Sequence, residues 1–506
     1  MKLTKLHVFL AALCAIGVLD ACTGLYVGKK VSADGSIILG KTEDDWGMKF
    51  WHWCQVVPRR QDGGPSEVRG DFGFRRALPE RTFRYVTCPR SSQYRAPRLV
   101  SQALNEKGLV VSGAVTAWPN HAAAALDPFV PDGTSWETMP DYLAATCSSA
   151  REAVEAFAQV IAEQGNFEGD IYFLADQGEA WYFEAYTGHH WVAVRMPEDC
   201  VAAFGNQYML GDIDLSSPDV RHSPGFEAFI AKLPRPVRGP SGRLHLAATI
   251  GAPLDDFHNL RTWWGIRCFA RSKSVRYEPL RRYDLFYRPD AKVSVADAMR
   301  FLRSRYEGTE WCPETNHKDF IKFVGSENQE LETVIEIRPD LPAPFAVTGW
   351  TALGPCAHSL FVPIPATILS FEPDWSRDCP KGAAEDYRDE YGAANRVRKL
   401  ATLARLDHER YGMPIRRYWE SIEAKFLAEW PKVQEMAVAL GDDEKAAAAL
   451  TDYSRACQRT FSEKTKSLFD QLMAYMIVDV RTCWWHPAPD GYGIVPVPQN
   501  PPFDPK

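Results

Sequence analysis

Cys22 is the residue of this 506-residue chain whose surroundings most suggest chemistry. Lys2 and Lys5 precede an apolar stretch at 8–19, and Ala21 stands directly before Cys22. A basic start, a short apolar run and a small residue form the layout of an export signal, too short for a membrane span. A buried N-terminal helix is the alternative interpretation of the same residues. Cleavage after Ala21 would make Cys22 the first residue of the mature chain.

A cysteine at a chain start carries a thiol nucleophile and a base in one residue. Its free α-amine has a pKa near ~7.7 to 8.0, so at neutral pH a useful fraction of the amines can accept the thiol proton. The resulting thiolate can attack a carbonyl carbon without help from a distant histidine. Such a site still needs a donor for the oxyanion and polar groups that hold the amine.

The same cysteine also fits a chemically opposite interpretation. Leu19-Asp20-Ala21-Cys22 is close to a bacterial lipoprotein signal, in which the thiol carries diacylglycerol and the amine is usually acylated. Both catalytic groups would then be blocked, and the protein would be a tethered binding or structural protein. Asp20 suits the lipid signal poorly, and Leu19 suits ordinary signal cleavage equally poorly. The leader alone therefore leaves both interpretations open.

Two strands must position Cys22 if it is catalytic. The stretches "TGLYVGKKV" and "SIILGKTED" have strand character and flank Asp34-Gly35, a dipeptide that supplies the positive φ angles of a tight hairpin turn. A hairpin over these residues would bring Asp44, at the end of the second strand, back towards Cys22.

The rest of the chain predicts an α+β protein that ends in helices. Alternating apolar residues over 170–197 indicate a three-strand meander, and a serine start and glycine stop delimit a helix over 149–165. Further strands are expected within 108–118, 332–341 and 345–355. Helical periodicity dominates from about Asp386, over 387–412, 418–440 and 453–480, and the end of the chain is Pro-rich.

The composition limits which kinds of partner and cofactor we expect. The formal net charge is −7 with no long basic run, so nucleic acid is not expected as a partner, and no stretch after the leader is apolar enough to span a membrane. Setting aside Cys14 and Cys22 leaves ten of the twelve cysteines, an even number that could pair after export, but no pairing follows from the spacing. No CxxC occurs and the adjacent His189 and His190 would point to opposite faces of a strand, so we expect neither a metal nor another cofactor.

Several separated segments resemble one family of hydrolases. "CTGLYVGKKVSADGSIILGKTEDD" is similar to the start of the C69 dipeptidases, which belong to the N-terminal-nucleophile hydrolases and are related to the choloylglycine and penicillin V acylases. "NEKGLVVSGAVTA" is similar to the acylase branch, while "WYFEAYTGHHWVAVRMPED", "RTWWGIRCF" and "SENQELETVIEIRPDLPAPFAVTGWTALGP" resemble the dipeptidase branch in order and spacing. The resemblance covers most of the chain from Cys22 to about Pro373. It implies a four-layer αββα fold with a C-terminal helical segment.

The resemblance also implies four site residues. Cys22 matches the nucleophile, Asp44 the acid that holds its amine, and Asn206 an amide that donates to the oxyanion. A solvated carboxylate at a strand end is the alternative for Asp44, and a turn-forming residue is the alternative for Asn206. Arg261 matches an arginine near the pocket, although Arg267 is close enough in sequence to compete for that place.

Two positions depart from the family pattern or stay unassigned. Lys41 stands where an arginine is usual, and lysine lacks the planar fork of arginine, so no role is assigned to it. Val115 and Thr116 lie near the place of a second oxyanion donor, which is not assigned; a backbone N–H could serve.

We therefore expect a secreted or periplasmic cysteine hydrolase of dipeptides or short peptides, with lipid anchoring as the alternative localisation. An acylase of a bile-salt or penicillin type of amide is the alternative enzyme. Assembly into a homo-oligomer is left open. The expected organisation is a leader at 1–21, a catalytic domain at 22–375, a helical segment at 380–485 and a Pro-rich tail at 486–506.

Overall fold

A computed structural model describes residues 22–44, 52–61, 66–90, 96, 98–315, 323–377 and 392–484, with side chains to residue 478. The expected leader and Pro-rich tail lie outside these residues. Within them, two antiparallel sheets form the centre of the molecule. The six-stranded sheet has the order β12 (Val201–Phe204), β1 (Gly24–Val27), β2 (Ile37–Asp44), β16 (Gln329–Ile337), β17 (Val347–Leu353) and β18 (Val362–Pro365). The eight-stranded sheet has the order β14 (Val220–His222), β11 (Trp191–Arg195), β10 (Ala180–Ala185), β9 (Asp170–Ala175), β8 (Val110–Thr116), β7 (Gln102–Asn105), β6 (Tyr85–Thr87) and β3 (Gln55–Val57).

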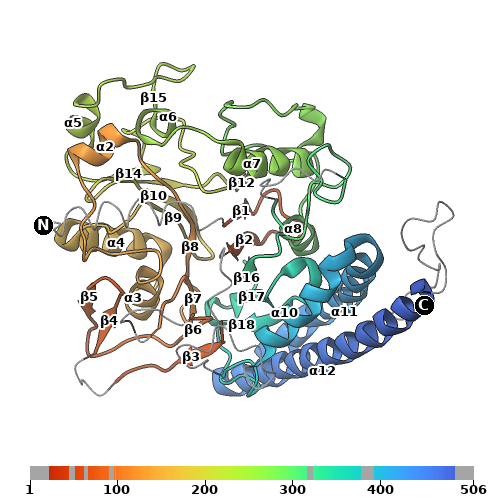
Figure 1. Cartoon of the computed structure of the whole chain (residues 1–506). Helices are drawn as coiled ribbons and strands as arrows, with labels where there is room; N and C mark the ends of the chain where they lie inside the picture. Colours follow the sequence, from red (N-terminus) through yellow and green to blue (C-terminus); the bar gives the residue numbers. More distant parts are fainter. Residues whose placement is uncertain are drawn as a thin grey trace, which may run out of the picture.

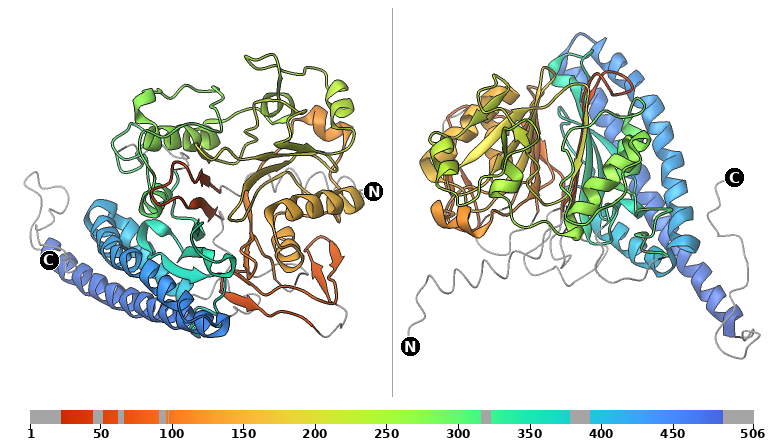
Figure 2. Two further views of the ribbon diagram at one scale, coloured as in Figure 1. Left: turned by 180° about the vertical axis from the view of Figure 1, so that it is seen from behind. Right: turned by 90° about the horizontal axis from the view of Figure 1, so that it is seen from above.

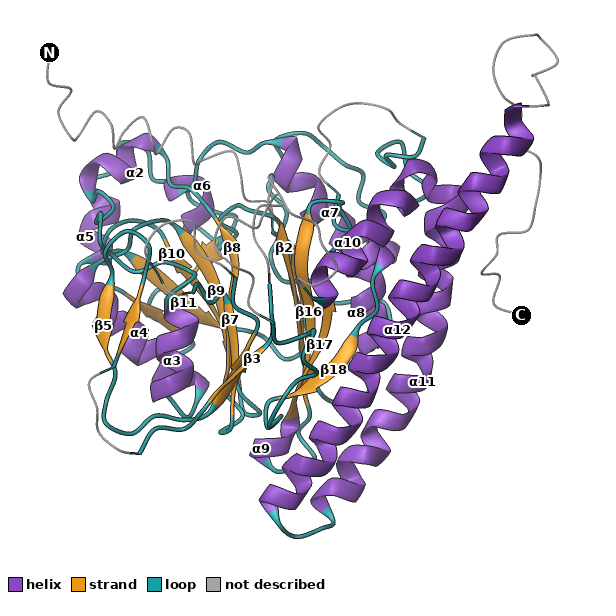
Figure 3. Ribbon diagram, turned by 60° about the horizontal axis from the view of Figure 1, so that its bottom comes forward, coloured by secondary structure: helices purple, strands orange, loops and turns teal. Residues whose placement is uncertain are grey.

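Helices cover the outer faces of both sheets, so the layers run helix, sheet, sheet, helix (Figures 1 and 3). The outer face of the eight-stranded sheet carries α3 (Met139–Thr146) and α4 (Ala150–Gln164). The six-stranded sheet is covered by α7 (Asp256–Phe269), α8 (Val295–Leu302), α10 (Ala393–Ala404), α11 (Met413–Val438) and α12 (Asp443–Trp484). The predicted α+β class with a four-layer αββα arrangement is confirmed.

Shorter elements complete the fold at its edges. They are helices α2 (His121–Leu126), α5 (Phe226–Ala231), α6 (Leu246–Ile250) and α9 (Ala343–Ala346), and the strand pairs β4 (Glu67–Arg69) with β5 (Arg75–Ala77) and β13 (Asp212–Ile213) with β15 (Leu244–His245).

The core between the two sheets contains an aromatic cluster beside β12. Phe204 on β12 packs edge-on against Phe173 and Tyr182 of the facing sheet, with ring centroids 5.7 and 5.3 Å apart. Gly24 of β1 makes room for this ring, because a Cβ there would come within 2.4 Å of Phe204 Cζ. The sheets can therefore close together next to the start of β1, where Cys22 lies.

The connection between β1 and β2 is longer than the expected tight turn. The strands pair from Gly24↔Lys41 to Val27↔Ile38, and residues 28–36 form the connection. Only Gly35 in this connection has a positive φ, at 87°. Contacts with distant parts of the chain hold it open: Gly28 N–H donates to Cys200 O, and Ala33 N–H donates to Val293 O. The predicted pairing of the two strands is correct, and the predicted tight turn is wrong.

The C-terminal helices are integral to the second half of the fold. Figure 2 shows α12 running along the outer side of α10 and α11. Trp430 of α11 donates from Nε1 to Thr348 Oγ1 at 3.0 Å, which joins the helix to β17. In the part of the chain that the structure describes, we find no helix with the length and apolar character that crossing a membrane requires.

Candidate active site

Arg261 links two of the predicted site residues. It lies on α7, which begins at its cap Asp255 and packs on β12. Its guanidinium donates to the backbone carbonyl of Cys22 and to Asn206 Oδ1, the latter at 3.1 Å. The same group donates to Thr23 Oγ1 at 3.3 Å and to His258 Nδ1 at 2.7 Å. Helix α7 therefore holds the residues just after β12 and just before β1 in one place.

Asn206 has a defined orientation because its two ends have different partners. It follows β12 directly; its Oδ1 accepts from Arg261, and its Nδ2 donates to Thr116 Oγ1 at 3.2 Å. A side-chain amide nitrogen carries two hydrogens, and within the described residues only one N–H of Asn206 has an acceptor, which leaves the second for a ligand. A fixed amide N–H that shares the Arg261 guanidinium with Cys22 is a suitable donor for an oxyanion.

Asp44 lies at the end of β2, on the strand next to the start of β1. Thr23 N–H donates to Thr42 Oγ1 at 2.9 Å and Thr42 N–H donates to Thr23 O at 3.0 Å, which continues the pairing of the strands towards Cys22. Ser326 Oγ donates to Asp44 Oδ2 at 3.5 Å. The β1–β2 pair thus brings Asp44 close to Cys22, as the sequence predicts.

Burial determines the electrostatics around Cys22, Asp44 and Arg261. Cys22 is only 2% exposed and the side chains of Asp44 and Arg261 are buried. Burial lowers the pKa of the Arg261 guanidinium, because desolvation disfavours the charged form, while the nearby Tyr306 and Asp44 act in the opposite direction. Asp44 is thus close enough for its charge to be felt by the arginine that contacts Cys22.

Lys41, the position that departs from the family pattern, belongs to a buried ion pair. Its Nζ lies 3.2 Å from Glu43 Oε2 and 5.0 Å from the ring centroid of Trp136. Burial raises the pKa of Glu43, but the neighbouring Lys41, His52 and Arg90 and a hydrogen bond from Ser101 together outweigh burial and lower this pKa to about 2. Lys41 is therefore matched by a carboxylate on its own strand, two residues away.

Glu184 of β10 supports the loop that follows Asn206. Among the described residues, Glu184 accepts four hydrogen bonds with donor–acceptor distances of 2.5 to 3.2 Å, and burial raises its pKa to about 7 against the effect of these bonds. The donors are the backbone N–H groups of Met209 and Leu210 and the hydroxyl groups of Tyr182 and Tyr186. Two of them belong to the residues just after Asn206, so Glu184 fixes the backbone that carries the candidate oxyanion donor.

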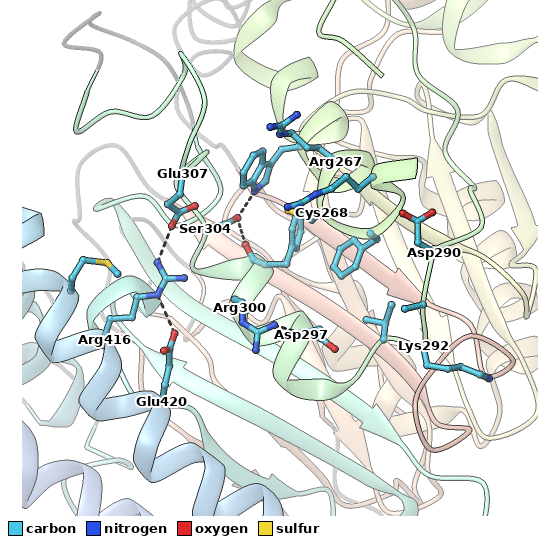
Figure 4. A pocket seen from close by; sticks show the side chains of 17 residues that line it. Arg267, Cys268, Asp290, Lys292, Asp297, Arg300, Ser304, Glu307, Arg416 and Glu420 are labelled. Atoms are coloured by element: carbon cyan, nitrogen blue, oxygen red, sulfur yellow. Dashed lines mark hydrogen bonds and ion pairs between the residues drawn. The ribbon is translucent and has the colours of Figure 1, made fainter. Parts of the chain in front are cut away.

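A separate cavity of about 680 Å³ lies beside the C-terminal half of α7 (Figure 4). Arg267 and Cys268 line it, together with Arg416 of α11, which pairs with Glu307 and Glu420. The four predicted site residues are not among those that line this cavity. Of the two arginines that compete for the family position, Arg261 contacts Cys22 and Arg267 faces this cavity.

Three residues of this corner were not predicted as site residues. Thr116 was considered only for a second oxyanion donor, and in the structure it orients the first. His258 precedes Arg261 by three residues, a spacing that places both on one helical face, so a helix prediction there would have found it. Glu184 lies inside the predicted meander, where no local signal separates a buried acid from an outward-facing one.

Comparison with known proteins places the chain in a family. The model of peptidase family C69 matches residues 21–420. "Probable dipeptidase B" of Streptococcus pyogenes serotype M1 is 28% identical over 361 residues, which are 68% of this chain and 71% of that protein. "Probable dipeptidase" of Latilactobacillus sakei is 25% identical over 472 residues, which are 90% of this chain and 95% of the other.

Solved structures of low similarity were also found. Two variants of the conjugated bile acid hydrolase of Clostridium perfringens align with 66% of this chain and 89% of theirs, at 13 and 14% identity and TM-scores of 0.27 and 0.29. Because these TM-scores are low, the assignment of the four-layer arrangement is based only on the sheets and helices of this protein's own structure. The family match, by contrast, covers most of the chain, and we conclude that this protein belongs to peptidase family C69 and is a peptidase.

Proposed function

We propose that this peptidase is a cysteine dipeptidase whose nucleophile is Cys22, exposed as the first residue by removal of residues 1–21. The observation that carries the proposal is the bonding of one guanidinium, that of Arg261, to both the Cys22 carbonyl and Asn206 Oδ1. The match to the family begins at residue 21, next to Cys22, and the relatives reported above are named as dipeptidases.

In the proposed cycle, the groups that react with or bind the substrate belong to Cys22 and Asn206. The α-amine of Cys22 takes the thiol proton, and the thiolate attacks the carbonyl carbon of the substrate peptide bond. The second N–H of Asn206 Nδ2 donates to the oxyanion that forms. The Cys22 ammonium then gives its proton to the leaving amine, which departs and leaves a thioester. The Cys22 α-amine takes a proton from the water that attacks the thioester carbon, and the Cys22 thiolate leaves and receives that proton back from the ammonium.

The other residues hold these groups in place. Asp44 is suited to bind the Cys22 ammonium, because a buried carboxylate at the end of β2 favours a positive charge beside it. Arg261 keeps Oδ1 of Asn206 turned away from the substrate and so presents the N–H side. Its positive charge also favours the thiolate form of Cys22.

The experiment compares Cys22→Ala with Cys268→Ala, a matched change of a cysteine that lines the separate cavity. Both proteins are assayed on a panel of dipeptides and on bile-salt and penicillin amides. We expect Cys22→Ala to lose hydrolysis and keep its thermal transition, and Cys268→Ala to retain activity. Full activity of Cys22→Ala would end the proposal, and a preference for the bile-salt or penicillin amides would favour the acylase.

The state of the chain start is tested on the mature protein from its native host. An intact mass equal to an unmodified chain beginning at Cys22 supports the proposal, including export of the protein. An added mass of diacylglycerol and acyl groups would instead identify a lipid-anchored protein, with both catalytic groups blocked.

A further inference from the structure

Two buried cysteines other than Cys22 face each other across neighbouring strands. Cys54 Sγ and Cys88 Sγ are 3.1 Å apart, closer than an ordinary contact of two sulfur atoms. Cys54 is completely buried and Cys88 is 9% exposed. The proposed catalytic cycle uses neither thiol.

The register of the strands places the two residues directly opposite. Strands β3 and β6 pair from Val57↔Tyr85 to Gln55↔Thr87, and an antiparallel bridge joins His52 to Arg90 beyond them. Counting along both strands from either side, Cys54 falls opposite Cys88.

Backbone hydrogen bonds identify the type of this pair. Trp53 N–H donates to Pro89 O at 3.2 Å, whereas Cys54 N–H points away from β6 and donates to Trp375 O at 2.7 Å. Cys54 and Cys88 therefore form a non-hydrogen-bonded pair, in which facing Cα atoms are closest, at about 4.5 Å. That separation falls within the range of about 4.4 to 6.8 Å that a disulfide bridges.

We propose that Cys54 and Cys88 form a disulfide when the chain folds in an oxidising compartment, with a small-molecule or protein disulfide as the oxidant. The Cys54 thiolate attacks the oxidant, and a mixed disulfide forms as one thiolate leaves. The Cys88 thiolate then attacks the Cys54 sulfur and displaces the second thiolate. Two protein thiols become one disulfide and the oxidant is reduced to two thiols. This exchange takes place during folding, before β3 and β6 bury both sulfur atoms.

The bond would secure an edge of the fold next to the buried ion pair. Strand β3 is the edge strand of the eight-stranded sheet, and β6 is its one neighbour there. The His52 ring lies 3.1 Å from Cys88 O and 3.5 Å from Glu43 Oε1, so a link between these strands also restrains the position of His52 beside Glu43. Sulfur atoms of other described cysteines contact oxygen atoms instead, as Cys312 does with Glu314.

The full-length protein folded with oxidised glutathione tests the proposal. The protein is denatured without reductant, alkylated, digested and analysed by mass spectrometry. We expect a linked pair of peptides containing Cys54 and Cys88, lighter by two hydrogen atoms than the sum of the two. Alkylation of both residues, or a link of either to another cysteine, would overturn the proposal.

A double variant, Cys54→Ala with Cys88→Ala, supplies the control. The wild type and the double variant should take up the same number of alkyl groups, because the disulfide hides two thiols of the wild type. Two more groups on the wild type would contradict the proposal. Reductant should lower the melting temperature of the wild type by several degrees and leave that of the double variant unchanged; if both respond alike, this disulfide is not the cause.

Discussion

At the scale of single residues, the site depends on an amide with a fixed orientation. Asn206 accepts from Arg261 through one end and donates to Thr116 through the other. The hydrogen-bond network therefore determines which end of the amide can meet an oxyanion. Few side chains could replace it, because the position needs an acceptor and a donor in one planar group.

Asn206→Ala should lower kcat by roughly 10²- to 10³-fold, the usual effect of losing an oxyanion donor. Asn206→Asp is the more informative change, because aspartate keeps the acceptor for Arg261 and loses the N–H. We expect Asn206→Asp to be at least as inactive as the alanine variant, with an unchanged thermal transition. Measured kcat values on one dipeptide decide the matter: near-normal turnover of Asn206→Asp would exclude this role.

Arg261→Lys tests the second residue of the site. A lysine ammonium cannot reproduce the planar fork that contacts Cys22, Thr23 and Asn206 at once. We expect a fall in kcat of about 10-fold or more, because Asn206 loses its fixed orientation.

Arg267→Lys is the matched control, since this arginine lies on the same helix and faces the separate cavity. It should keep the activity of the wild type. Equal activity of the two lysine variants would contradict the role given to Arg261.

The sequence was sufficient to predict the site residues that match family motifs. It was insufficient to predict the residues that contact them in the fold. Cys22, Asn206 and Arg261 were predicted by resemblance, and the structure brings them together. Thr116 lies in a matched segment, but its contact with Asn206 depends on how the two sheets pack together, which local patterns do not contain. His258 belongs to no matched segment and contacts Arg261 from three residues away on α7.

At the scale of elements, the loop after β12 is held by a carboxylate from the facing sheet. Glu184→Ala would leave the buried N–H groups of Met209 and Leu210 without their acceptor. Each buried unsatisfied donor costs about 1 to 3 kcal/mol, so we expect a loss of roughly 3 kcal/mol in unfolding free energy and a lower kcat.

Glu184→Gln keeps an acceptor oxygen for those N–H groups and should retain most of the stability and activity. Urea unfolding of both variants, with kcat measured alongside, checks the expectation. Equal losses of stability and kcat in Glu184→Ala and Glu184→Gln would show that the acceptor oxygen is not the cause of the effect.

Elements with a clean internal pattern were predicted well. The meander over β9, β10 and β11 and the helix α4, with its Ser149 cap, follow from alternation and from capping residues. The shape of the β1–β2 connection was not predicted, because it depends on hydrogen bonds to Cys200 and Val293, which are distant in sequence. Helix α7 escaped prediction because it is buried on most sides and shows little amphipathic periodicity.

At the scale of the whole molecule, a buried ion pair joins the C-terminal helices to the rest. Arg303, after α8, donates from Nη1 to Glu423 Oε2 of α11 at 2.6 Å, and Phe361 N–H donates to Glu423 Oε1 at 2.8 Å. Glu423→Ala would leave a buried guanidinium without its charge partner. We expect a loss of about 3 to 5 kcal/mol in unfolding free energy, measured by urea titration.

Glu420→Ala provides the comparison within the same helix. Glu420 is 40% exposed in its pair with Arg416, and removing such a partner usually costs below about 1 kcal/mol. Similar losses for the two variants would mean that the Glu423 pair does not anchor the helices.

Two buried glutamates predict how stability depends on pH. The folded state lowers the pKa of Glu43 from 4.5 to about 2, so its stabilising contribution is complete well above pH 4.5 and is lost as the pH falls towards 2. It raises the pKa of Glu184 from 4.5 to about 7, so that contribution is complete below pH 4.5 and is lost as the pH rises through 7. Each shift corresponds to about 3 kcal/mol.

Melting temperatures between pH 2.5 and 8 check these signs. Glu43→Gln should flatten the fall on the acid side, and Glu184→Gln the fall between pH 5 and 7. A wild-type curve that rises steadily from pH 5 to 7, unchanged by Glu184→Gln, would contradict the second assignment.

The contacts that the structure describes around the start of β1 involve the Cys22 carbonyl and the backbone and hydroxyl of Thr23. These atoms lie on the C-terminal side of the Ala21–Cys22 peptide bond, so cutting that bond removes none of them. If this bond is the one that is cut, these described contacts of Cys22 and Thr23 are already formed before the cut. Activation would then consist of removing residues 1–21 while these contacts stay in place, and the timing of one proteolytic event would decide when the activity appears.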